Sequence, residues 1–142
     1  MIARLLRNYA SYLIAAIAAI AAAGWIKSDF IKEAILPNLT TIVLALLAIN
    51  VQTTAVIAVK LREIADREGG SFRSTVNEFR VAIVEQAVLV VFSLVFVALS
   101  KSPLLIPLSG LLDVSALFVF LGSLHIFVDT TNALLLSMFP KK

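Results

Sequence analysis

The residues best suited to chemistry in this sequence are ionisable side chains placed inside apolar segments. His125 and Asp129 lie four residues apart in the apolar segment 111–136, and Glu85 lies in the apolar segment 81–100. Steps of four residues put side chains on one face of a helix, so we expect His125 to hydrogen-bond to Asp129. Ionisable groups in a membrane core cost about 2.5–3.5 kcal/mol each on insertion scales, which makes them candidates for function.

Uncharged polar residues extend this set. Asn50 and Thr53 lie in the apolar segment 39–59, and Asn132 follows Asp129 on the same helical face. At a rise of 1.5 Å per residue, Asn50, Glu85 and Asp129 fall in the same half of a bilayer, which predicts a polar layer shared between helices. The residues that we expect to line or gate a pore are Asp129, His125, Asn50, Glu85, Asn132 and Thr53.

The same residues have plainer interpretations. Glu85 is shallow enough to reach lipid headgroups or to pair with Arg80, because a long side chain near the membrane edge reaches water at little cost. Asp129 could serve only an internal hydrogen bond, and His125 could be a packing histidine bonded to a serine or a carbonyl group.

Most catalytic chemistries are excluded. The chain has no cysteine and one histidine, which removes disulfides, thiolate metal sites and most nucleophilic schemes. One histidine cannot supply two axial haem ligands within a chain, and no spacing typical of metal ligands occurs. No Walker loop or GxSxG motif is present. We expect a protein that is not an enzyme and that holds no metal or cofactor.

The composition indicates the elements that position these residues. Hydrophobic residues make up 61% of the 142 residues and charged residues 15%, against averages of roughly 50% and 25%. A soluble globule of this size could not enclose so much apolar surface. We therefore predict a single domain, 1–142, that is an all-α integral membrane bundle of four transmembrane helices. Their expected ranges are 9–26, 39–59, 81–100 and 111–136.

Basic residues set the expected orientation. Nine of the twelve Lys and Arg residues lie before 9–26, between 39–59 and 81–100, or after 111–136. The positive-inside rule then places both termini and the segment 60–80 in the cytoplasm. Apolar positions and capping signals within 60–80 predict a helical hairpin, although its mixed charges also suit a solvated loop. The net charge of +3 reflects this topology, and we expect no binding to nucleic acid.

Small residues predict how the first helix packs. Ala15, Ala19 and Ala23 repeat every four residues, a spacing that lets helices approach closely in lipid, and Gly122 offers a similar surface in 111–136. Alanine is also simply a good helix former. The charged start and small residues of this segment resemble a secretory signal, but its length and Trp25 favour a retained helix. The link 27–36 is expected to form an interfacial helix that turns Ile31 and Ile35 toward lipid.

Four short helices with a charged hairpin resemble the membrane component of the phage lambda Rex exclusion system. The similar features are Ile83-Val84-Glu85 with Leu89, Phe92 and 94–100 in the third segment, and Leu124-His125-Ile126 in the fourth. The resemblance covers the second to fourth segments, and the alanine-rich first segment departs from it. The pattern is also similar to small four-helix effectors of anti-phage operons. Both resemblances imply an ion channel of the bacterial inner membrane that depolarises an infected cell.

The functional expectation is thus a homo-oligomeric ion pore in the bilayer, because one chain has too few helices to enclose a water path. The resemblance implies a soluble cytoplasmic sensor as a partner, which we place at the hairpin 60–80. The alternative is a non-catalytic anchor or scaffold subunit of a larger complex. A small transporter stays open through dimerisation, although the chain has no internal repeat, and a holin-like lysis protein is a further alternative.

Overall fold

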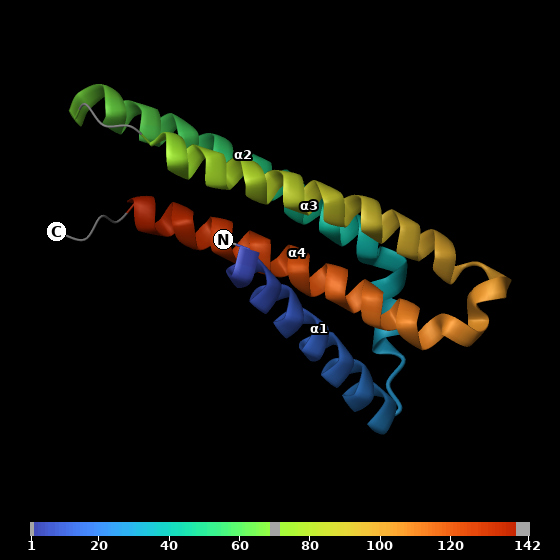
Figure 1. Ribbon diagram of the computed structural model, residues 1–142. Coiled ribbons are helices and arrows are strands. Elements are labelled where there is room, and N and C mark those ends of the chain that lie inside the picture. Colours follow the sequence, from blue (N-terminus) through green and yellow to red (C-terminus); the bar gives the residue numbers. More distant parts are fainter. Residues whose placement is uncertain (1, 69–71, 139–142) are drawn as a thin grey trace.

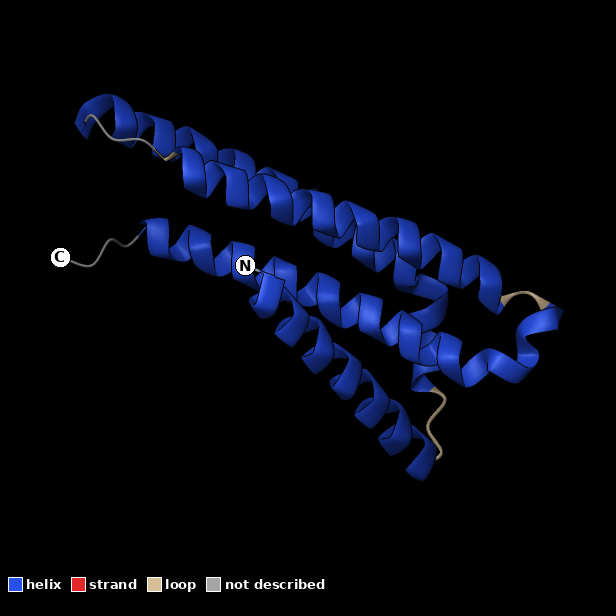
Figure 2. Ribbon diagram, in the orientation of Figure 1, coloured by secondary structure: helices blue, strands red, loops and turns tan. Residues whose placement is uncertain are grey.

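The computed structural model describes residues 2–68 and 72–138, and it is all-helical over them, as predicted. Its four main helices are α1 (Ile2–Trp25), α2 (Leu36–Glu68), α3 (Arg73–Ser100) and α4 (Ser109–Met138). A π-helical turn, η1 (Ile31–Ile35), leads directly into α2, and a 3₁₀ turn, η2 (Pro103–Leu108), precedes α4. Non-helical joins in the described residues are short, as Figure 2 shows.

Three of the helical stretches are long and apolar enough to cross a membrane. They are Ile31–Arg67, Thr75–Ser100 and Ser109–Leu135. The apolar part of α1, Tyr9–Trp25, is shorter. At 1.5 Å per residue it covers about 26 Å, against ~30 Å for a hydrocarbon core. The three long helices are those of a membrane protein, and α1 differs from them in length.

Helices α2, α3 and α4 form the bundle, and α1 leans out of it. In Figure 1, α2, α3 and α4 run side by side with alternating directions, whereas α1 diverges from them and packs on α4. Because the directions alternate, the start of α1, the turn between α2 and α3 and the end of α4 point toward the same side. We call this the hairpin side, and it matches the side on which the sequence gathers its basic residues.

Apolar side chains from every helix form the core. Leu39 and Val43 of α2 are fully buried, and they cluster with Leu89 of α3 and Val119 of α4. Burial of this kind stabilises membrane bundles by close van der Waals packing, because lipid tails are as apolar as the core itself.

The predicted lipid-facing set in the link 27–36 is wrong for Ile31 and Ile35. Both side chains are buried in the core, whereas Trp25, Ile26 and Phe30 are exposed. The reason is that η1 is continuous with α2, so these two residues extend the inward stripe of that helix rather than lying flat on a membrane surface.

Within the chain, two of the three alanines predicted to pack along α1 do not face the core. Ala15 and Ala19 are exposed, whereas Ala16 is fully buried and Ala23 is partly buried against the core. Tyr12 sets this register because its ring packs on Phe118 of α4, which turns the residue four positions later inward.

Gly122 does provide a close helix contact. A Cβ placed on it would lie 3.5 Å from Leu89 Cδ1 and 4.0 Å from Tyr12 Cδ2, so α1 and α3 both approach α4 here.

We expect Gly122→Ala to be tolerated or slightly stabilising. The added methyl would make ordinary contacts, and alanine is favoured over glycine in a helix interior by about 1 kcal/mol. Gly122→Leu, in contrast, should overpack the contact and destabilise the fold by about 1–3 kcal/mol. Thermal unfolding in detergent, followed by the fluorescence of Trp25, measures both. A stable leucine variant would mean that neither α1 nor α3 packs closely at Gly122.

The segment 60–80 contains the end of α2 and the start of α3. α2 runs to Glu68 and α3 begins at Arg73, while 69–71 lie outside the described residues. Ile57, Leu61 and Phe79 form a second buried cluster, against which Ala133 and Leu134 of α4 pack. With 33 residues, α2 is about 50 Å long, so it exceeds a ~30 Å hydrocarbon core by several turns.

Candidate functional site

A cluster of titratable side chains forms where α1, α3 and α4 meet. His125 Nε2 lies 3.2 Å from Asp129 Oδ2, the contact that the four-residue spacing predicts. The ring of Tyr12 lies 5.1 Å from the imidazole, measured between centroids. Glu85 of α3 is close enough to His125 for an electrostatic interaction. We call Tyr12, Glu85, His125 and Asp129 the outer cluster.

The outer cluster is open to the surroundings of the bundle. The side chain of Asp129 is 61% exposed and that of His125 is 38% exposed. Asn132, one turn further along α4, is exposed as well. These polar groups therefore face outward from a single chain.

The level of the cluster follows from its neighbours. Phe79 packs near Ala133 and Leu134, so Asp129 lies about one helical turn, ~6 Å, inward from that contact. Glu85 lies ~7 Å inward from Arg80 along α3. Both carboxylates thus sit within the apolar length of their helices, on the hairpin side.

A second polar group lies inside the bundle between α2 and α3. Asn50 Nδ2 donates a hydrogen bond of 2.5 Å to Gln86 Oε1. The two side chains are 2% and 0% exposed. We call Asn50 and Gln86 the amide pair. Nearer the opposite side, Ser93 Oγ donates to Thr40 Oγ1 at 3.2 Å, so hydrogen bonds join α2 and α3 at two levels.

The amide pair leaves hydrogen-bonding groups unused. Within the described residues, Asn50 Oδ1 and Gln86 Nε2 form no other hydrogen bond, and neither do the buried hydroxyl groups of Thr54 and Ser123. If the oxygen and the nitrogen of both amides were exchanged, the unpaired groups would still be one amide nitrogen and one amide oxygen, because the bond between the two amides uses one of each. These two unpaired groups suit a water molecule, which both donates and accepts hydrogen bonds. They do not suit a cation, because the N–H group would point its positive end at the ion.

The predicted polar layer is therefore divided in two. Asn50 faces inward to Gln86, whereas Glu85, His125 and Asp129 gather under α1 on the outside of the α2–α3–α4 packing. Thr53 is half-buried, and the neighbouring Thr54 carries the buried hydroxyl group. Gln86 was not among the predicted residues. Its position beside Glu85, in a segment with few polar side chains, is the signal that could have found it.

Asp113 is a further residue that the sequence analysis did not select. It is buried near the start of α4, and Lys32 of η1 is close enough for an electrostatic interaction. A cavity of about 250 Å³ adjoins it, lined also by Lys27, Ser28 and Asp29. This carboxyl group lies on the side opposite the hairpin, so it is separate from the outer cluster.

No group of three or more His, Cys, Asp or Glu side chains in the described part of the chain is arranged to hold a metal ion. Comparisons with protein-family models, with curated proteins and with solved structures gave no match. The site is therefore interpreted from its own geometry.

Proposed function

We propose that this protein is a homo-oligomeric ion pore whose outer cluster faces the conducting path. The observation that supports this is the exposed Asp129 carboxylate, which lies within the apolar length of α4. A carboxylate facing lipid at this level would be costly, and such groups face protein or a water-filled cavity instead. A second copy of the chain, or water held between copies, provides that environment.

A path between copies also agrees with the core of one chain. Leu39, Val43 and Val119 fill the space between the helices and are almost fully buried. The interior of the bundle is therefore closed between the amide pair and the end opposite the hairpin side. Water and ions would therefore pass where several copies meet. A closed ring of identical subunits brings each Asp129 to the same radius, and a ring of carboxylates favours cations.

The cellular setting that we propose rests on the sequence resemblance and on the distribution of basic residues. The pore lies in a bacterial inner membrane with the hairpin side in the cytoplasm. Its opening depolarises the cell in an anti-phage response, and a soluble sensor acts on the extension formed by α2 and α3.

Native mass spectrometry of the protein in mild detergent is the first test, and we expect a particle of four or more copies. Reconstitution of that particle into planar bilayers should then give cation currents. For currents recorded from variants of Asp129, the matched control is Asp66→Asn, which removes an exposed carboxylate outside the apolar segment 39–59. A monomer, or a complex with one copy of this chain and a fixed partner, would contradict the pore and favour an anchoring subunit.

A further inference from the structure

A large apolar crevice opens between α1, α3 and α4. Its volume is about 530 Å³, within the ~300–1,000 Å³ typical of sites for small molecules. It exists because α1 packs on α4 and leans away from α3, as Figure 1 shows. Six apolar side chains make up most of its wall: Leu13, Val88, Leu89, Phe92, Phe96 and Phe118.

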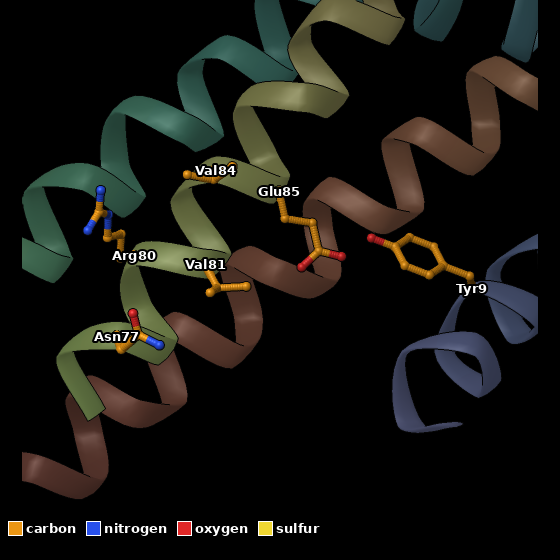
Figure 3. Close-up of a pocket in the computed structure, with 6 residues that line it drawn as sticks. All are labelled: Tyr9, Asn77, Arg80, Val81, Val84 and Glu85. Atoms are coloured by element: carbon orange, nitrogen blue, oxygen red, sulfur yellow. The ribbon is translucent and has the colours of Figure 1, made fainter. Parts of the chain in front are cut away.

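One ionisable carboxylate lines this crevice. Glu85 forms part of its wall together with Tyr9, and the same two residues border an adjoining cavity of about 400 Å³. Figure 3 shows the Glu85 carboxylate and the Tyr9 hydroxyl group directed toward each other across the gap between α3 and α1. The Glu85 carboxyl group therefore stands at the junction of the two cavities.

The nearby basic side chains leave this carboxyl group available. Arg80 lines the adjoining cavity, but Figure 3 shows its guanidinium group directed away from Glu85. His125 interacts with Glu85 electrostatically, but its Nε2 is already 3.2 Å from Asp129. Aromatic rings surround the same space. Phe92 and Phe96 stack at 6.2 Å on α3, and Tyr9 lies 5.9 Å from Phe118.

We infer that this crevice binds an amphiphilic organic cation, a quaternary ammonium or phosphonium ion with an apolar body. Glu85 supplies the counter-charge, and the aromatic rings contact both the apolar groups and the cationic centre. Leu13, Val88 and Phe92 are exposed on the wall of the crevice, so such a ligand can enter from outside the bundle. This inference does not depend on conduction, because it concerns a binding site within one chain.

Binding of tetraphenylphosphonium to the protein in lipid nanodiscs tests the inference. We expect saturable binding, and we expect Glu85→Gln to raise the dissociation constant about tenfold or more, because the half-buried counter-charge is lost. Val88→Trp should abolish binding by filling the crevice. Glu78→Gln is the matched control, since it removes an exposed carboxylate of the same helix outside the crevice and should leave binding unchanged.

Triphenylphosphine oxide, a neutral compound of similar shape, provides a second measurement that needs no variant. The wild-type protein should bind it at least about tenfold more weakly than the cation. Equal binding of both compounds would mean that the crevice takes neutral chains such as lipid, and would overturn the inference. Uptake that matches empty nanodiscs would overturn it as well. Neither result would bear on whether the protein conducts ions.

Discussion

Replacing Asp129 by asparagine is expected to lower the cation preference of the proposed pore by about tenfold, which corresponds to ~1.4 kcal/mol. The side chain is 61% exposed on α4, so it adds one carboxylate group per copy to the proposed path between copies. Asparagine keeps the shape and the ability to accept a hydrogen bond from His125, so the number of copies should not change.

Reversal potentials under a salt gradient measure this effect, and native mass spectrometry confirms that the oligomer is intact. Asp66→Asn serves as the control, because it removes the same charge from the extension of α2. An unchanged reversal potential in the Asp129→Asn variant would mean that this residue does not line the proposed pore.

The second large effect is expected at the amide pair. Asn50→Leu should destabilise the fold by about 1–3 kcal/mol, because it leaves the Gln86 amide buried without a partner. Replacing both residues by leucine should recover most of that loss, since exchanging both partners of a hydrogen bond for apolar groups is often nearly neutral. Gln86→Leu alone should resemble the first variant.

A double-mutant cycle on thermal or denaturant unfolding measures the coupling between the two residues. Thr53→Val is a suitable control, because Thr53 is half-buried on the same helix and does not contribute to the amide pair. Additive losses in the double variant would mean that the two amides stabilise the bundle independently.

Composition and hydropathy were sufficient to predict the helices themselves. The long apolar segments around 39–59, 81–100 and 111–136 all lie within helices, and the four-residue spacing of His125 and Asp129 predicted their contact. Local periodicity determines such features, because they depend on residues close together in the chain.

The rotation of each helix about its axis could not be predicted in the same way. In a membrane bundle the lipid-facing and core-facing residues are equally apolar, so the pattern of a helix does not distinguish its two faces. This explains why Ala16 rather than Ala15 and Ala19 packs inward, and why Ile31 and Ile35 are buried. The partner of Asn50 depended on the same rotation, since Gln86 and not Glu85 faces α2.

The position of α1 has a consequence for how the protein is made. α1 is synthesised before α2 and α3, whereas α4, the helix on which it packs, is synthesised after them. Tyr12 can meet His125 only after roughly 110 further residues, which takes on the order of ten seconds at ~5–20 residues per second. During that interval α1 lacks the helix on which it packs. The stretch of α1 between Tyr9 and Trp25 carries no charge and is rich in alanine, which suits it to this period without a packing partner.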